Sequence, residues 1–159
     1  MIRRAQIKDI DQINELLNDV LNIHHEGRSD LFKSDTKKYT DEQLTEIIND
    51  DSRPIFVLQE DGLILGYAFC LFQQHLNDNI LTDVKTLYID DLVVRKGYRG
   101  RHLGKRLYEY VKRFSKESGC HNLTLNVWAF NENARKFYES LGMKPQKIFM
   151  EEILDEGDR

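Results

Sequence analysis

The sequence predicts a single α/β (α+β) domain over residues 1–159, with one mixed central β-sheet flanked by helices. Three observations favour this class. Apolar residues recur at helical spacing in several segments, β-rich runs alternate with those segments, and a chain that is 40% hydrophobic can build one core of ordinary size. The expected element order is β-α-α-β-β-β-α-β-α-β, which suits helices packed on one mixed sheet.

The first part of the chain is predicted to hold one short strand and two helices. Residues 1–6 form an extended start, and an apolar repeat of helical spacing covers residues 7–22. Thr40 followed by Gln43 has the pattern of a capping box, so we expect a second helix to begin there. The polar segment 24–39 between the two helices is typical of an irregular loop.

The middle of the chain is predicted to form three strands. Residues 54–60 and 63–73 are β-rich runs on either side of Asp61-Gly62, a strong sequence signal for a tight hairpin. Residues 81–94 form a further β-rich run that leads directly into a basic turn.

The last part of the chain continues the alternation of helices and strands. An apolar stripe that begins at Leu103 predicts a helix ending near Gly119. Residues 121–128 alternate as a strand, residues 131–141 have a helical pattern, and residues 147–154 are predicted to be the final strand.

Composition limits the classes of function. A net charge of −4 argues against a dedicated nucleic-acid binder. The longest apolar run, residues 63–72, is far shorter than the roughly 20 residues of a membrane span, and the first residues lack the apolar stretch of a signal peptide. Two cysteines are expected to be reduced thiols. We therefore expect a cytoplasmic protein without membrane or nucleic-acid partners.

The strand-to-helix segment 92–107, LVVRKGYRGRHLGKRL, carries the strongest functional signal. Its glycines allow a tight backbone, and amides at a helix start have no partner within the helix, so they favour an anion. Its basic side chains are suited to phosphate oxygens. It matches neither a Walker loop nor G-x-G-x-x-G. A diphosphate-bearing cofactor is therefore the first hypothesis, and a solvated basic face is the alternative.

Two separated segments match the pattern of a known family. In YIDDLVVRKGYRGRHLGKRL, Arg99 and Gly104 occupy the first and last positions of the pyrophosphate loop Q/R-x-x-G-x-G/A. In NVWAFNENARKFYESLGM, Asn131 and Tyr138 are in register with N-x-x-A-x-x-[FL]-Y-x-x-x-G-[FM]. With the element order, these motifs resemble those of the GCN5-related N-acetyltransferases (GNAT) over essentially the whole chain. His102 replaces the middle glycine of the loop, and we expect the turn to stay helical there so that its amide still donates.

The resemblance implies that acetyl-CoA is the co-substrate, and it implies a role for each matched residue. The implied acetyl-CoA-binding residues are Leu92, Val93, Val94, Arg99, Gly100, Arg101, His102, Leu103, Gly104, Lys105 and Asn131. The first three would act through their backbone and have side chains typical of core. Tyr138 matches the residue that acts as general acid toward the CoA sulfur, with packing in a helix stripe as its alternative. Asn131 also has the pattern of a helix N-cap.

The general base is a choice between two carboxylates. An acceptor amine with a pKa of about 10.4 is mostly protonated at pH 7, so a carboxylate would help to remove its proton. Asp90 stands where some relatives, notably polyamine-type acetyltransferases, carry a glutamate, and it is the predicted base. Neighbouring strand side chains face opposite ways, so only one of Asp90 and Asp91 can face the site unless a bulge intervenes. Ion-paired carboxylates without a catalytic role are the competing interpretation.

The sequence thus predicts an acetyl-CoA-dependent N-acetyltransferase that moves an acetyl group to a primary amine by direct attack in a ternary complex. The alternative is a catalytically inactive GNAT-like module that binds acyl-CoA. No metal is expected, because His24 and His25 lack further ligands at metal-binding spacing. The loop that contains them is a candidate wall of the acceptor pocket. The acceptor is a small-molecule or peptide amine whose identity stays open, as do a homodimer and the use of longer acyl donors.

Overall fold

The computed structural model describes residues 1–155, and the chain falls into two compact units. Residues 1–126 form the first unit and residues from Val127 onward belong to the second. That residues 1–159 act as one domain remains a prediction.

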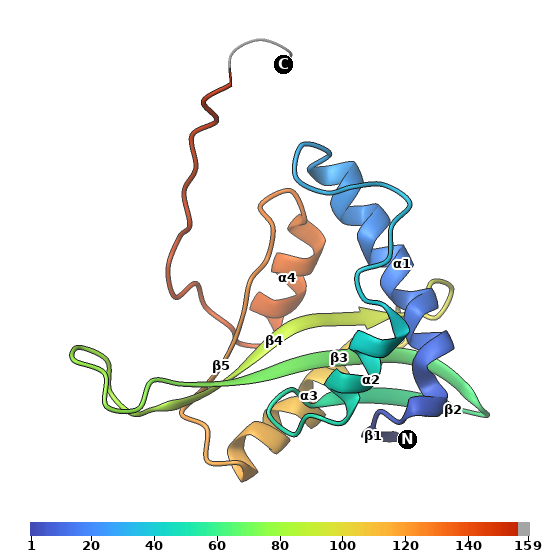
Figure 1. Cartoon of the computed structure of the whole chain (residues 1–159), viewed down its shortest axis with the longest axis horizontal. Helices are drawn as coiled ribbons and strands as arrows, with labels where there is room; N and C mark the ends of the chain where they lie inside the picture. The colour runs from blue at the N-terminus through green and yellow to red at the C-terminus, as the bar shows by residue number, and fades with distance from the viewer. Residues whose placement is uncertain (156–159) are drawn as a thin grey trace. The chain divides into compact units, whose positions relative to one another are not determined.

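The first unit is built on a five-stranded mixed sheet with strand order β1-β2-β3-β4-β5 (Figure 1). The strands are β1 (Ile2–Arg4), β2 (Ile55–Glu60), β3 (Leu63–Gln74), β4 (Lys85–Val94) and β5 (Asn122–Leu125). The helices are the 3₁₀ turn η1 (Ile7–Asp9), α1 (Ile10–Gly27), α2 (Asp41–Ile48) and α3 (Leu103–Glu117). Successive strands from β1 to β4 are antiparallel, and β4 and β5 are parallel.

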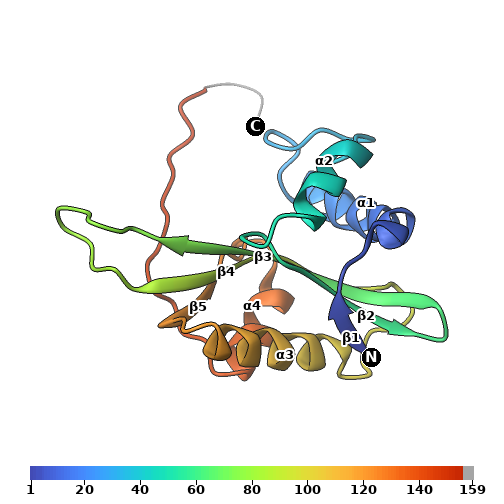
Figure 2. The ribbon, with the colours of Figure 1, turned by 60° about the horizontal axis from the view of Figure 1, so that its bottom comes forward.

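Helices cover both faces of this sheet. Figure 2 shows α1 and α2 on one face and α3 on the other. Buried side chains of α1 and α2, among them Ile13 and Leu44, form one cluster with residues of β2 and β3. Leu103 and Leu107 of α3 pack with Leu58 and Leu65 on the opposite face. The predicted fold class, a mixed sheet flanked by helices, is confirmed.

Local sequence signals explain how several elements begin and end. The Asp61-Gly62 hairpin joins β2 to β3 with φ angles of 50° and 78°, as predicted. At the start of α2, the Thr40 hydroxyl accepts from the Gln43 amide at 3.1 Å, and the Gln43 side chain accepts from the Thr40 amide at 2.9 Å. α1 extends to Gly27, beyond the predicted end, because a solvent-facing last turn needs no apolar stripe.

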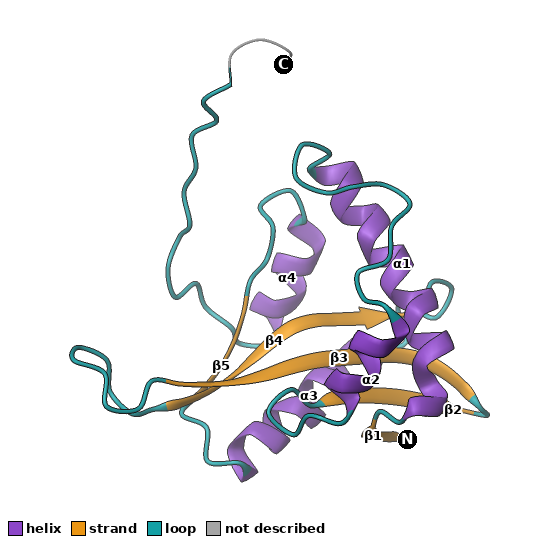
Figure 3. Ribbon diagram, in the orientation of Figure 1, coloured by secondary structure: helices purple, strands orange, loops and turns teal. Residues whose placement is uncertain are grey.

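The second unit contains one helix and an extended segment. α4 (Glu132–Ser140) matches the predicted helix. The predicted final strand over residues 147–154 is wrong for the single chain, because the described residues after α4 form neither strand nor helix (Figure 3). An apolar composition favours a strand there, but a strand also requires a neighbour for its backbone hydrogen bonds.

Candidate active site

Strand β4 carries a β-bulge inside the predicted site. Its pairing with β3 sets Asp91 opposite Phe69 and Ile89 opposite Cys70. Asp90 is therefore an extra residue without a partner across the strands. A bulge interrupts the strict alternation of strand side chains. With the bulge, the charges of both Asp90 and Asp91 act on the Lys38 ammonium. The sequence allows both carboxylates to face the site only if such a bulge is present.

β4 and β5 pair along only part of β4. Their parallel pairing runs from Thr86 to Ile89 of β4 and stops before the bulge, whereas the pairing of β4 with β3 continues to Val94. Among residues 1–155, no strand pairs with the β5-facing edge of residues 90–94. Backbone groups on that edge can therefore bind an extended ligand, as open sheet edges do.

The side chains of Leu92, Val93 and Val94 pack in the core, as expected. Val93 belongs to the cluster under α1 and α2. Leu92 and Val94 pack against the cluster under α3. Only the backbone of these three residues is then left to contact a ligand on the open edge of β4.

Two tyrosines and a lysine surround the two carboxylates. Lys38, from the loop between α1 and α2, places its Nζ 3.1 Å from Oδ2 of Asp90. The hydroxyl of Tyr67 on β3 donates to Oδ2 of Asp91 at 2.7 Å. The Lys38 ammonium also lies 5.4 Å from the centre of the Tyr39 ring. These contacts bring a loop and two strands together at the bulge.

Burial sets the protonation of this cluster. It raises the pKa of Asp91 to about 6, against the opposing effects of the Tyr67 hydrogen bond and the Lys38 charge. It also raises the pKa of Tyr67, which the charge of Asp91 raises further. Burial lowers the pKa of Lys38, but the charges of Asp90, Tyr39 and Asp91 raise it more, so the ammonium stays charged. The site thus holds the Lys38 ammonium and, in Asp91, a carboxyl whose pKa burial raises to about 6.

The sequence prediction missed Lys38 and Tyr67. Lys38 lies in a polar loop where nothing in the sequence pattern separates it from the neighbouring Lys37. Tyr67 lies in an apolar strand and has the pattern of plain core. A signal was available for Tyr67 alone, because a buried tyrosine hydroxyl needs a hydrogen-bond partner.

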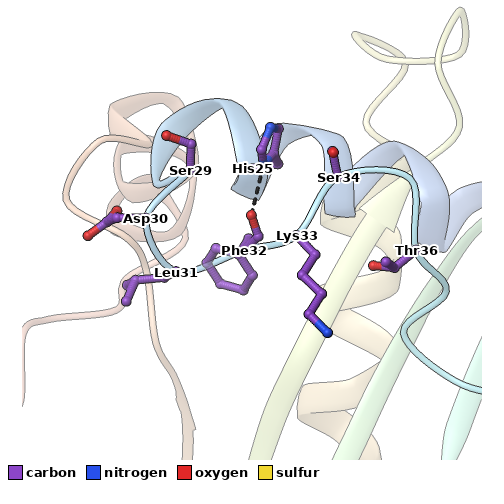
Figure 4. Close-up of a pocket in the computed structure, with 8 residues that line it drawn as sticks. All are labelled: His25, Ser29, Asp30, Leu31, Phe32, Lys33, Ser34 and Thr36. Carbon is purple, nitrogen blue, oxygen red and sulfur yellow. Dashed lines mark hydrogen bonds between the residues drawn. The ribbon is translucent and has the colours of Figure 1, made fainter.

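The last turn of α1 has two histidines with different surroundings. Because α1 continues to Gly27, the expectation that the loop contains His24 and His25 is wrong. Burial lowers the pKa of His24, and the Lys38 charge lowers it further, which places His24 within electrostatic reach of the carboxylate cluster. His25 instead directs Nδ1 to the Phe32 carbonyl at 2.7 Å (Figure 4). His25 and Phe32 line a shallow hollow of about 590 Å³ within the loop. Of the two histidines, His24 is therefore the one that senses the charges of Lys38 and Asp90.

The turn between β4 and α3 has the backbone of an anion site. Gly97 and Gly100 have φ angles of 90° and 83°, which side-chain-bearing residues rarely adopt. The first amide to donate within α3 is that of Arg106, to the His102 carbonyl at 3.0 Å. The amides of Leu103, Gly104 and Lys105 thus precede the helical hydrogen-bond pattern and lie at the positive end of the helix dipole.

The expectation that the turn stays helical at His102 is wrong. His102 is the N-cap of α3 and has left-handed backbone angles, φ 61° and ψ 20°. This conformation is one that glycine adopts without strain. The histidine therefore occupies a glycine-type position, and its amide does not have helical geometry.

The basic side chains of the turn divide into anchored and exposed ones. Arg95 donates from Nε to the Ile64 carbonyl and from Nη1 to Glu15, both at 2.8 Å, so it fastens the turn to β3 and α1. Its Nη2 is buried without a hydrogen bond among the described residues. Arg99 and Lys105 are exposed. Arg101 is exposed as well, with its guanidinium 5.1 Å from the centre of the Tyr98 ring. These exposed side chains are therefore better suited to phosphate oxygens than Arg95.

Asn131 and Tyr138 lie in the second unit. The Asn131 side chain accepts from the Ala134 amide at 3.1 Å, which confirms it as the N-cap of α4. Tyr138 is half-buried on α4, with its ring 5.1 Å from that of Phe137 in an edge-on arrangement. Their contacts with CoA remain predictions.

Comparison with known proteins identifies the family. A sequence model described as the acetyltransferase (GNAT) family matches residues 17–143, which is most of the chain. The protein therefore belongs to the GNAT family, which confirms the resemblance and the N-acetyltransferase class at the level of the family. No helix within residues 1–155 has the length and apolar character needed to cross a membrane.

Individual relatives agree with this assignment. An uncharacterized N-acetyltransferase of Lactobacillus delbrueckii subsp. lactis is 33% identical over 65% of this chain, and the match spans 57% of that protein's length. A crystal structure of a mutant BH1408 protein from Bacillus halodurans is 28% identical, with a TM-score of 0.92 over 97% of this chain and 99% of that one. A crystal structure of glucosamine-6-phosphate N-acetyltransferase from Arabidopsis thaliana is 27% identical, with a TM-score of 0.71 over 98% of both chains.

Proposed function

We propose that this protein transfers the acetyl group of acetyl-CoA to a primary amine by direct attack in a ternary complex. The observation that carries the proposal is the end of β4. There the strand leaves β5, bulges at Asp90 and runs into a helix start whose first amides are free of helical hydrogen bonds. The open backbone edge suits an extended cofactor, and the anion site beyond it suits the diphosphate of that cofactor. The carboxylates beside the edge suit an amine that must lose a proton.

The chain fits acetyl-CoA at the turn between β4 and α3. A side chain at Gly97 or Gly100 would meet nothing within 4 Å, so the turn has open space beside its backbone. Exposed Arg99 and Lys105 add positive charge. The residues proposed to hold the pyrophosphate are Arg99, Gly100, Arg101, His102, Leu103, Gly104 and Lys105. Asn131 is proposed to contact the CoA arm. Acetyl-CoA supplies an activated thioester carbonyl.

The acceptor is proposed to be a cationic amine that meets Asp90. This carboxylate is exposed and binds the Lys38 ammonium, so an incoming ammonium of the same charge can replace Lys38 there. Asp90 then takes the proton of the amine, directly or through water. Asp91 is the next residue along the bulge, and its raised pKa suits it to share that proton. The name of the Arabidopsis structure, an amino-sugar N-acetyltransferase, supports an amine acceptor.

Backbone and hydroxyl groups complete the proposed chemistry. A backbone amide within Leu92, Val93 and Val94 would donate to the thioester carbonyl oxygen on the open edge of β4. The hydroxyl of Tyr138 would donate to the CoA sulfur as the thiolate leaves. Because a tyrosine pKa of about 10 exceeds a thiol pKa of about 8.5, this hydroxyl acts mainly by hydrogen bonding to the developing charge.

The competing function is a GNAT-like module that binds acyl-CoA without turnover. The carboxylate pair beside the open edge favours the enzyme, because a receptor for CoA alone needs no proton acceptor next to the thioester position. A cytoplasmic location, a homodimer and the absence of nucleic-acid and membrane partners remain predictions.

The test is amine-dependent release of free thiol from acetyl-CoA across amino sugars, polyamines, aminoglycosides, amino acids and peptides. We expect turnover with at least one class and micromolar binding of acetyl-CoA by calorimetry. Gly104→Asp, which adds a negative charge at the helix start, should abolish binding. Lys116→Asp adds negative charge at the far end of α3 and should leave binding intact. Binding without turnover on the whole panel would support the acyl-CoA-binding module instead.

A further inference from the structure

Lys38 is a primary amine of this chain that lies against the proposed general base. Its Nζ is 3.1 Å from Oδ2 of Asp90, and its side chain is 33% exposed. In the proposed reaction, an acceptor amine gives its proton to this same carboxylate. The folded chain therefore places one of its own amines where the acceptor amine is expected.

The residue after Lys38 holds this part of the loop beside the bulge of β4. The Lys38 ammonium lies 5.4 Å from the centre of the Tyr39 ring, and that ring stacks on the ring of Phe69 at 5.9 Å. Phe69 is the residue of β3 that pairs with Asp91. Tyr39 also packs against the core cluster under α1 and α2. The backbone at Lys38 is thus anchored next to the carboxylates by its neighbour.

The Lys38 side chain can reach the proposed position of the thioester. Leu92 is the first residue whose backbone is proposed to bind the thioester carbonyl, and it follows Asp90 by two residues. A strand advances about 3.3 Å per residue, so the two positions are separated by about 7 Å along β4. Lysine has a flexible four-carbon stem, and rotation about its bonds moves Nζ over a distance of this order.

We propose that Lys38 is a self-acetylation site, at which Nζ takes the acetyl group of acetyl-CoA bound to the same chain when no acceptor is present. The inference rests on the proposed function. Asp90 takes one proton from the Lys38 ammonium, and the neutral amine attacks the carbonyl carbon of the thioester. The C–N bond forms and the C–S bond breaks. A second amine proton leaves with the sulfur as free CoA thiol, and Asp90 releases its proton to water.

Lys37 offers an internal standard for acetylation without catalysis. Its side chain is 61% exposed, and its Nζ lies 3.9 Å from Oδ1 of Asp41. Burial lowers the pKa of Lys38, but the nearby acidic groups raise it more, so Lys38 is both less exposed and more firmly protonated. The nucleophile is the neutral amine, so uncatalysed acetylation does not favour Lys38 over Lys37. A preference for Lys38 therefore indicates reaction within the site.

The first test follows isotopically labelled acetyl-CoA in the absence of an acceptor. The protein is digested with a protease that does not cut at lysine, and the label at both positions is measured by mass spectrometry. We expect Lys38 to be labelled at least about tenfold faster than Lys37, at a rate per molecule that does not depend on protein concentration. Labelling of Lys38 no faster than that of Lys37, or the same preference in heat-unfolded protein, would overturn the proposal.

Matched variants assign the acceptor and the base. Lys38→Arg keeps a cation beside Asp90 but cannot form the acetyl-lysine amide, so it should lose most of the label that the folded parent takes up. Lys37→Arg is the control and should be labelled like the parent. Asp90→Asn should slow labelling at Lys38 at least about tenfold. Parent-like uptake by Lys38→Arg, or parent-like labelling of Lys38 in Asp90→Asn, would contradict the proposal.

The amine panel, run on the same sample, separates failure of this inference from failure of the proposed function. Turnover of an amine while Lys38 stays unlabelled would refute self-acetylation alone. Labelling of Lys38 without turnover on the panel would support self-acetylation, because acetyl transfer then occurs within the chain. Neither labelling nor turnover would refute both the proposed acetyl transfer and the inference that rests on it.

Discussion

At the scale of single residues, the proposed role of Asp90 as general base can be tested directly. Asp90→Asn keeps the shape of the side chain but cannot accept the amine proton. General base assistance typically contributes about 10²-fold to 10⁴-fold to the rate, so we expect kcat to fall at least about tenfold with acetyl-CoA affinity unchanged. Steady-state rates and calorimetry on the same sample measure both quantities.

A matched variant separates proton transfer from the ion pair. Lys38→Met removes the cation that binds Asp90 but keeps the carboxylate. If the role of Asp90 were only to hold Lys38, the two variants would lose the same activity. We expect Lys38→Met to retain far more of the parent kcat than Asp90→Asn.

Asp91 should make the stability of the protein depend on pH. Burial raises its pKa from 3.8 to about 6, so between these values the folded protein binds a proton that the unfolded chain does not. The resulting stabilisation is fully present below pH 3.8 and is lost as the pH rises through about 6. Asp91→Asn removes this loss, so it should raise the melting temperature more at pH 8 than at pH 4.5. An equal shift at both pH values in scanning calorimetry would contradict this assignment.

His102 should store backbone strain at the start of α3. A left-handed residue with a Cβ costs about 1 to 2 kcal/mol, and glycine recovers this at an entropic cost of about 0.5 to 1 kcal/mol. We therefore expect His102→Gly to stabilise the protein by up to about 1 kcal/mol in urea unfolding. His102→Ala, which keeps the Cβ, should show no such gain. Equal effects of the two substitutions would mean that the side chain and not the backbone matters.

At the scale of elements, Gly66 permits the close contact of β3 with β4 and α3. A Cβ at this position would lie 2.7 Å from the Val93 carbonyl oxygen and 2.8 Å from Cδ1 of Leu107. We expect Gly66→Ala to destabilise the protein by about 1 to 3 kcal/mol, the usual range for overpacking. It should also weaken acetyl-CoA binding, because Val93 lies on the open edge of β4. A parent-like melting curve with parent-like affinity would show that the close contact at Gly66 does not fix the position of β4.

The elements of the first unit were predictable because their signals are local. Asp61-Gly62 specifies its hairpin, and Thr40 with Gln43 specifies the start of α2. The sequence left a bulge open at Asp90 and Asp91 but could not place it, because a bulge depends on how two strands pair and leaves no local pattern. The same limit applies to Lys38, whose partner is brought near it only by the folded chain.

At the scale of the whole molecule, the fold class and the family followed from the sequence, whereas the last strand did not form as predicted. The composition of residues 147–154 suits a strand, but a strand forms only where a neighbouring strand pairs with its backbone. His102 is a similar case, because its neighbour Leu103 begins a helix while His102 itself lies outside it. The pattern within a segment predicts whether that segment suits a helix or a strand. Contacts with other segments decide whether the helix or strand forms.

The central claim is that the Tyr138 hydroxyl takes part in acetyl transfer and that the ring is not only part of the helix packing, and Tyr138→Phe tests this claim most directly. The substitution keeps the ring and removes only the hydroxyl proposed to meet the CoA sulfur. We predict parent-like affinity for acetyl-CoA, melting within a few degrees of the parent, and a kcat at least about tenfold lower with a productive amine. A parent-like kcat, measured where chemistry limits turnover, would contradict the proposed acid role and the account of the site built on it.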